Sequence, residues 1–199
     1  MQKERVNVIK FLEEFKPQDH QEKTDIEKII ELILQYEDIF VRECLPAHIT
    51  ASALVVNPET MMVLLHNHRK LNKWLQFGGH ADGDTDLIRV ALKEASEETG
   101  LHDLKFYLSS VNEQPSPIDI ELQTIPEKNG VPEHYHLDFR FLLFTSEKDI
   151  PTPDESESQE LGFFSFLDIE KMGDKLDPAL MRLITKAKLI CAHLHRRIG

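Results

Sequence analysis

Apolar residues at helical spacing mark the first part of the chain. Four isoleucines, at positions 26, 29, 30 and 33, fall on one face of a helix. Thr24 and Glu27 have the spacing of a capping box, which predicts that this helix begins at Thr24. Because Pro46 cannot continue a helix, we expect a helical extension over residues 1–46.

The period changes from helical to alternating after Pro46. Residues 49–56 and 61–65 predict two strands, and the turn-forming residues 57–60 between them predict a hairpin. Residues 136–144 also alternate and predict a third strand. Its apolar face would carry Leu137, Phe139 and Phe141, and its polar face would carry His136, Asp138 and Arg140.

Loops, helices and short strands fill the rest of the chain. A loop over residues 77–86 precedes a helix from Leu87 to Thr99, with Asp84, Thr85 or Asp86 as its N-cap and Gly100 as its stop. Strands are predicted at 104–111 and 163–166, an exposed loop at 147–160, a helix at 178–196, and no element at 112–133. This order indicates an α/β fold, a sheet covered by helices, over residues 47–199.

The charge balance limits the partners of the chain. Its 199 residues hold 23 Lys and Arg against 35 Asp and Glu, so the formal net charge is −12. This charge argues against a general DNA binder and against binding to anionic membranes. The negative charge is still compatible with a small phosphorylated substrate, because a metal ion can supply positive charge locally. The polar N-terminus, the lack of an apolar run of ~18 residues and the two distant cysteines lead us to expect a cytoplasmic protein.

Three carboxylates share one side of the helix predicted at 87–99. Glu94, Glu97 and Glu98 have i, i+3, i+4 spacing, at which like charges repel by about 0.2–0.5 kcal/mol per pair. Taken alone, they fit a solvated acidic face. Carboxylate oxygens are also the ligands that Mg²⁺ and Mn²⁺ prefer, so a metal site is the other interpretation.

The surrounding residues favour the metal site. Residues 79–101 resemble the Nudix box, whose pattern is G-x5-E-x7-R-E-U-x-E-E-x-G-U, where U is a bulky or aliphatic residue. The matching positions are Gly79, Glu94, Ala95, Glu97, Glu98, Gly100 and Leu101. Two positions depart from the pattern, since Thr85 replaces the first Glu and Lys93 replaces the Arg. The resemblance implies a Nudix-type α/β/α sandwich with a mixed sheet.

The resemblance also implies an activity. Nudix enzymes hydrolyse a nucleoside diphosphate linked to another moiety, so ADP-ribose, nucleotide sugars and nucleoside triphosphates are all open as substrates. In this family divalent ions, Mg²⁺ or Mn²⁺, neutralise the diphosphate and lower the pKa of the attacking water. By the resemblance, Glu94 and Glu98 would bind metal, and Glu97 would be a further ligand or the catalytic base. A backbone carbonyl of Gly78 or Gly79 would complete the metal site.

The two departures concern the support of this site. In the family, the Arg and the first Glu form an ion pair that holds the catalytic loop. Lys93 keeps the charge without the bidentate fork, and Thr85 cannot form an ion pair. An aspartate of the loop, at position 82, 84 or 86, is expected to substitute. We therefore expect a retained metal site with looser surroundings.

Residues outside the box are candidates for substrate contacts. Asp138 is the first candidate for an additional acidic residue, ahead of Glu133, Glu155, Glu157 and Glu160. The adjacent aromatic and basic cluster at 134–136 would contact the substrate through His136, or else simply pack. The basic segment 66–73, which includes Arg69, would attract phosphate or form a solvated hairpin end. Trp74 is expected in the core rather than as a platform for a base.

Two functions follow from these observations. We favour a Nudix-type enzyme, because a module that only binds ligand has no need for three mutually repelling glutamates. The alternative is a Nudix-fold ligand-binding or regulatory module with little catalysis, which Thr85 and Lys93 motivate. The helical extension would cover the core or form a homodimer contact.

Overall fold

The computed structural model describes residues 2–69, 71–109, 113–128, 130–146, 148, 158–173 and 176–198. The helices are α1 (Gln2–Glu14), α2 (His20–Gln35), α3 (Leu87–Thr99), α4 (Phe166–Met172) and α5 (Pro178–Ile198). The strands are β1 (Ala47–Asn57), β2 (Met62–His68), β3 (Lys73–Leu75), β4 (Phe77–His80), β5 (Lys105–Phe106), β6 (Asp119–Ile125), β7 (His134–Phe144) and β8 (Ser158–Ser165).

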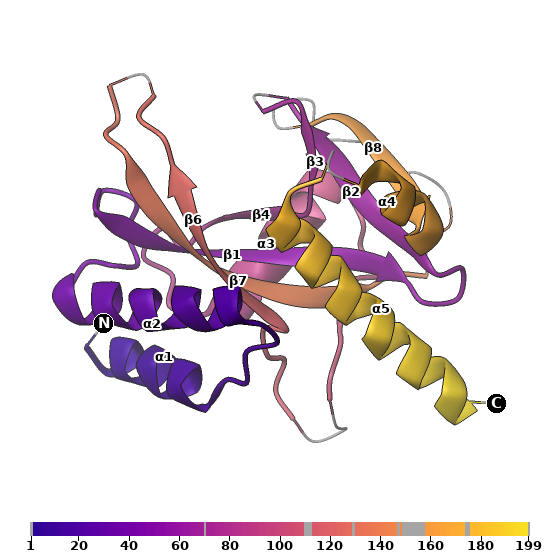
Figure 1. Cartoon of the computed structure of the whole chain (residues 1–199), viewed down its shortest axis with the longest axis horizontal. Helices are drawn as coiled ribbons and strands as arrows, with labels where there is room; N and C mark the ends of the chain where they lie inside the picture. Colours follow the sequence, from indigo (N-terminus) through magenta and orange to yellow (C-terminus); the bar gives the residue numbers. More distant parts are fainter. Residues whose placement is uncertain are drawn as a thin grey trace.

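β1 and β7 form the parallel centre of one mixed sheet (Figure 1). They pair in register from Ala47 opposite Tyr135 to Val56 opposite Phe144. On the outer side of β1, β4 and then β2 pair antiparallel with successive parts of the strand. On the outer side of β7, β6 and then β5 do the same, while β3 and β8 both pair with β2. The sheet therefore branches on each side of its central pair.

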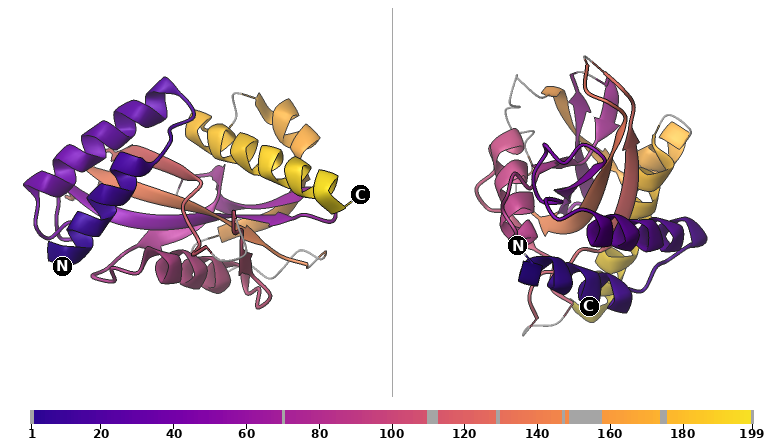
Figure 2. Two further views of the ribbon diagram at one scale, coloured as in Figure 1. Left: turned by 90° about the horizontal axis from the view of Figure 1, so that it is seen from below. Right: turned by 90° about the vertical axis from the view of Figure 1, so that its left-hand side faces the viewer.

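Helices cover both faces of this sheet (Figure 2). α3 lies on one face and α5 on the other. The core on the α3 side includes Ala51, Ala91 and Phe139, and the core under α5 includes Leu54 and Leu183. The expected α/β/α sandwich with a mixed sheet is confirmed. In the described part of the chain, every helix is too short or too polar to cross a bilayer.

The helical N-terminal region is also confirmed, although its start signal differs. α2 begins at His20, because Asp19 caps it by accepting the N–H of Glu22 at 2.8 Å. Thr24 lies inside the helix and donates its hydroxyl to the carbonyl of His20 at 3.0 Å. The capping box predicted at Thr24 is therefore wrong, because the same signal occurs one turn earlier at Asp19 and Glu22. The last residue of α2 is Gln35, so residues 36–46 are not helical.

Strand pairing changes several further expectations. Residues 77–80 were expected in a loop. They form β4 instead, because they pair with the edge of β1 that faces away from β7. β6 has no sequence-based counterpart, and it alternates between Ile120 in the core and polar residues on the other face. The strand expected at 104–111 shortens to β5, and residues 110 and 111 lie outside the described residues. Phe166 begins α4 instead of ending a strand, because Ser165 caps that helix.

Candidate active site

α3 carries the three glutamates and is anchored at both ends. Asp86 caps it by accepting the N–H of Arg89 at 3.1 Å, and Gly100 ends it in the left-handed region with φ of 71°. Ala91 and Ala95 are buried, and their small side chains let the helix approach the sheet. The predicted helix is confirmed from its first to its last residue, and Asp86 is the cap among the three candidates.

Two of the glutamates lie against the backbone of β4. Glu98 is buried, and its Oε2 accepts the N–H of Gly78 at 3.1 Å. The carboxylate of Glu94 lies against Gly79, where an added Cβ would be only 2.5 Å from Oε2. The fold therefore brings Glu94 and Glu98 of α3 to the two glycines of β4, which puts carboxylate and backbone groups side by side.

Glu97 points to solvent, and Lys93 connects it to Glu94. The side chain of Glu97 is 60% exposed. Nζ of Lys93 lies 3.0 Å from Oε1 of Glu94 and 3.2 Å from Oε2 of Glu97, and these hydrogen bonds raise the pKa of Lys93. Two of the three carboxylates, those of Glu94 and Glu97, are thus paired with one lysine of their own helix.

The expected substitution of a loop aspartate for the partner of Lys93 does not occur. Asp84 accepts two hydrogen bonds from Arg89, at 2.8 and 2.6 Å, and Asp82 accepts two from Arg42, one of them at 2.6 Å. Asp86 also lies near Arg89, at 3.8 Å. The arginines have more donors and a planar fork, so they bind these carboxylates while Lys93 turns to the glutamates of its own helix.

Asp138 lies on a polar stripe that β1 and β7 form on the face of the sheet opposite α3. It is buried, and its carboxylate accepts hydrogen bonds from the hydroxyls of Thr50 (3.0 Å) and Ser52 (2.7 Å). Burial raises the pKa of Asp138 above its usual value. His136 lies two residues earlier on the same face and is half-buried. Both remain predicted substrate contacts.

Comparison with known proteins identifies the family of this chain. The model of the NUDIX domain matches residues 46–184 of the chain. The chain belongs to the Nudix family. The family resemblance of residues 79–101 is thereby confirmed, and α3 with its preceding loop is the Nudix box of this protein.

Individual Nudix relatives resemble only part of the chain. A protein of Lactococcus lactis subsp. cremoris (strain MG1363), named a probable DHNTP pyrophosphohydrolase, is 30% identical over 125 residues, which are 62% of this chain and 65% of that protein. The chain therefore matches less than two thirds of the length of that relative.

Solved Nudix structures have the same fold. A NUDIX-family hydrolase from Clostridium perfringens gives a TM-score of 0.58 at 24% identity, over 72% of this chain and 97% of its own. A C. elegans Ap4A hydrolase gives 0.55 at 17% identity, over 73% of this chain and 98% of its own. At these identities the likeness concerns the fold alone.

The two glycines of β4, Gly78 and Gly79, should respond differently to alanine. In Gly79→Ala the new Cβ meets the end of the Glu94 side chain, which can rotate away, so we expect a folded protein with weakened divalent-ion binding. In Gly78→Ala the Cβ would lie 2.6 Å from the Cα of Ser52, which cannot move. We expect that variant to lose about 1–3 kcal/mol of unfolding free energy. Urea denaturation and metal titration distinguish the two, and equal losses of stability would contradict this prediction.

The basic segment 66–73, just before the Nudix box, contains both charged and uncharged side chains at neutral pH. Arg69 is exposed just after β2 and remains a predicted substrate contact. His66 is buried, and burial lowers its pKa to about 4, so it carries no charge at neutral pH. Lys70 lies outside the described residues. Trp74 is partly buried and packs edge-on against Phe164, with ring centroids 4.8 Å apart, as expected for a core position.

Glu121 of β6 is a titratable group that was not singled out from the sequence. It pairs with Asp138 across β6 and β7, and it lies 2.8 Å from Arg140. Burial raises the pKa of Glu121 to about 7, although Arg140 acts in the opposite direction. Alternation in residues 119–123 was the signal that could have revealed it. The other acidic candidates are exposed, namely Glu133 and Glu160, or outside the described residues, namely Glu155 and Glu157.

Glu121 should make stability fall as the pH rises. Its folded pKa of about 7 exceeds the ordinary 4.5, so the folded state binds more protons than the unfolded state between these values. Stability is therefore lost from about pH 4.5 to 7, by at most about 3 kcal/mol. We expect the melting temperature of Glu121→Gln minus that of the wild type to increase between pH 5 and pH 8. A constant difference across this range would show that Glu121 titrates normally.

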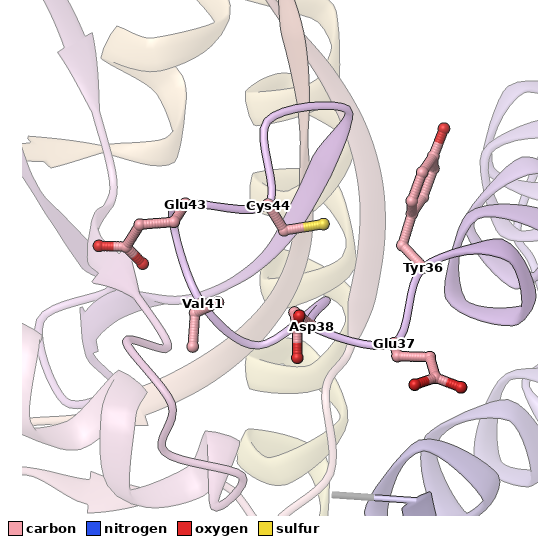
Figure 3. A pocket seen from close by; sticks show the side chains of 6 residues that line it. All are labelled: Tyr36, Glu37, Asp38, Val41, Glu43 and Cys44. Atoms are coloured by element: carbon pink, nitrogen blue, oxygen red, sulfur yellow. The ribbon is translucent and has the colours of Figure 1, made fainter.

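One surface hollow lies outside the Nudix box (Figure 3). It measures about 190 Å³ and is formed by the connection between α2 and β1. Its lining residues are Tyr36, Glu37, Asp38, Val41, Glu43 and Cys44. None of the predicted site residues lines it.

Proposed function

We propose that this Nudix protein is a metal-dependent pyrophosphohydrolase, which cleaves the phosphoanhydride bond of a nucleoside diphosphate linked to another moiety. The supporting observation is that Glu94 and Glu98 lie against the Gly78 and Gly79 backbone, with Glu97 beside them. Hard oxygen donors of this kind suit Mg²⁺ or Mn²⁺.

Each residue has a distinct part in this proposal. Glu94, Glu98 and the carbonyl of Gly79 hold the cation. When bound, a divalent ion offsets the charge of the diphosphate and lowers the pKa of water. Glu97 is the most exposed of the three carboxylates and accepts the proton of the attacking water, or adds a further ligand. Arg69 attracts the diphosphate, while His136 and Asp138 contact the remainder of the substrate.

Hydrolysis of a substrate panel tests the activity. The panel contains ADP-ribose, nucleotide sugars and nucleoside triphosphates, together with DHNTP because the Lactococcus lactis relative is named for it. With Mg²⁺ or Mn²⁺ we expect hydrolysis of at least one compound, and none in chelator. A triphosphate would release pyrophosphate or phosphate, whereas ADP-ribose or a nucleotide sugar would give a nucleoside monophosphate and a sugar phosphate. Failure to hydrolyse any of them with either metal would contradict the proposal.

Metal binding at the Nudix box is tested separately by thermal unfolding. Mn²⁺ at about 100 times its Kd should stabilise the protein by about 2.7 kcal/mol, because it binds the folded state only. Glu98→Gln should remove most of the resulting rise in melting temperature. Glu27→Gln is the matched control, because Glu27 is exposed on α2 and is not a candidate for the site. An unchanged metal response in Glu98→Gln would place the site elsewhere.

A second candidate function is a ligand-binding or regulatory module. Lys93 favours it, since its ammonium neutralises Glu94 and Glu97 without any metal. This candidate predicts tight binding of a diphosphate compound by calorimetry, without metal-dependent turnover.

The cellular location and the oligomeric state also belong to this proposal. We place the protein in the cytoplasm, where its two free thiols, Cys44 and Cys191, stay reduced. A homodimer through residues 1–46 is supported by Val6 of α1 and Leu34 of α2, which are large, apolar and exposed. Light scattering during gel filtration measures the mass, and a monomer at high concentration would contradict the dimer.

A further inference from the structure

We infer that His48, His134 and His136 form a second metal site, for a cation of the Zn²⁺ class, distinct from the glutamates of the Nudix box. The ligand nitrogens of these three side chains lie within 4.8 Å of one another. Imidazole suits Zn²⁺, Ni²⁺ and Cu²⁺, whereas Mg²⁺ and Mn²⁺ prefer oxygen ligands. The chemistry of this cluster therefore differs from that of the box, and the inference does not depend on the proposed hydrolysis.

Strand register brings the histidines together. His48 of β1 lies opposite His136 of β7 in the parallel ladder, and His134 is two residues earlier on the same face. β4 contributes His80, opposite Thr50, with its ring centroid 5.1 Å from that of His48 and 4.9 Å from that of His136. These three strands are neighbours in the sheet (Figure 1). The cluster thus stands on paired strands, which hold ligands more firmly than loops do.

Backbone carbonyls orient two of the rings. Nδ1 of His48 lies 3.1 Å from the carbonyl of Cys44, in the connection shown in Figure 3, and Nδ1 of His134 lies 2.8 Å from the carbonyl of Pro132. A carbonyl only accepts, so each Nδ1 carries the proton and donates it. Nε2 is then left with its lone pair. Metal-binding histidines are oriented in this way in many proteins.

The Nε2 atom of His48 gives the most direct evidence for a bound ligand. The residue is 2% exposed, and Nε2 is buried without a hydrogen-bond partner among the described residues. A buried polar atom left unpaired costs about 1–3 kcal/mol, so such atoms are rare in folded proteins. A cation bound by His48, His134 and His136 supplies the missing partner.

The spacing of the rings is close to that of a metal site, and the cluster is accessible from solvent. Nitrogens around a tetrahedral Zn²⁺ ion are about 3.3 Å apart, which follows from Zn–N bonds of about 2.0–2.1 Å. Small side-chain rotations close the cluster to that spacing. His80 and His136 are half-buried and give an entering ion access from solvent.

Zn²⁺ titration of the metal-free, full-length protein tests this site. With excess Mg²⁺ present, calorimetry should find one Zn²⁺ per chain for the wild type and for Glu98→Gln. His48→Gln and His136→Gln should each weaken this binding by more than about 100-fold, since they remove a ligand. His68→Gln is the matched control, because His68 is on β2 outside the cluster. Wild-type affinity in His136→Gln, or loss of binding in Glu98→Gln, would overturn the inference.

X-ray absorption of the Zn²⁺-loaded wild type gives a readout that needs no variant. We expect outer-shell scattering from about three imidazole rings. Coordination by oxygen alone would show that Zn²⁺ binds elsewhere, which would also overturn the inference. Circular dichroism of the two histidine variants confirms that lost binding is not lost folding. Because binding is measured without any substrate, this result does not depend on whether the hydrolysis assay succeeds.

Discussion

Glu97→Gln is expected to slow the turnover of a diphosphate substrate by roughly 10²–10⁴-fold, the range typical for loss of a general base. Glutamine has nearly the same shape as glutamate but cannot accept a proton. Since Glu98 and Glu94 keep their contacts with β4, substrate affinity should change much less than kcat. Steady-state kinetics with Mn²⁺ at fixed pH measure kcat and KM separately.

The controls for this variant separate the two roles considered for Glu97. Glu27→Gln removes an exposed carboxylate of α2, outside the Nudix box, and should leave kcat unchanged. If Glu97→Gln abolishes the Mn²⁺-induced rise in melting temperature, Glu97 is chiefly a metal ligand. If kcat stays at the wild-type value, Glu97 is not the base. Lys93 keeps Glu94 as a partner at 3.0 Å in the variant, which limits indirect effects.

Asp119→Asn is expected to lower the free energy of unfolding by about 3–5 kcal/mol, the usual cost of breaking a buried ion pair. Asp119 is completely buried and contacts three cations. It accepts from Arg140, and it lies 2.8 Å from both Arg182 and Lys186. Burial opposes ionisation of Asp119, but the three cations bring its pKa below the usual value. The variant leaves these cations buried with less compensation.

Urea denaturation measures this loss, and an exposed pair provides the control. Glu31→Gln breaks the ion pair between Glu31 and Lys28 on α2, whose side chains are largely exposed. Such pairs contribute about 0.5 kcal/mol or less, so the midpoint should hardly move. Similar midpoints for Asp119→Asn and the wild type would show that the buried cations find other partners.

The ion pairs around Asp119 also connect two helices, α2 and α5, to the sheet. Lys186 of α5 lies 2.6 Å from Glu22 of α2, and Glu22 also accepts the N–H of Ile120 at 3.0 Å. Ile120 belongs to β6, whose outer edge would otherwise leave this N–H unpaired. α2 and α5 are therefore joined to the strand that carries Asp119 and Glu121.

Local signals in the sequence were sufficient for the Nudix box and its helix. Asp86 and Gly100 supply a cap and a left-handed stop, so the bounds of α3 follow from residues close in sequence. The spacing of Glu94, Glu97 and Glu98 follows from the helical repeat alone. Alternation likewise predicted the strands at 49–56 and 136–144, because apolar residues that pack toward α3 alternate with polar residues over part of β1 and β7, although both faces are largely buried.

Only the tertiary structure decided what the partners of these residues are. β4 was expected as a loop because residues 77–86 are rich in Gly and Asp. In the fold, the backbone at Ser52 comes so close that position 78 requires glycine, and the Glu94 side chain lies against Gly79. Thr50 and Asp138 are 88 residues apart in sequence and hydrogen-bonded in the fold, and His48 meets His136 through the same ladder. No local pattern specifies the register of two strands so distant in sequence, because register depends on how the whole core packs. The glutamates of the box could therefore be read from the sequence, whereas the buried state of Asp138 and the histidine cluster could not.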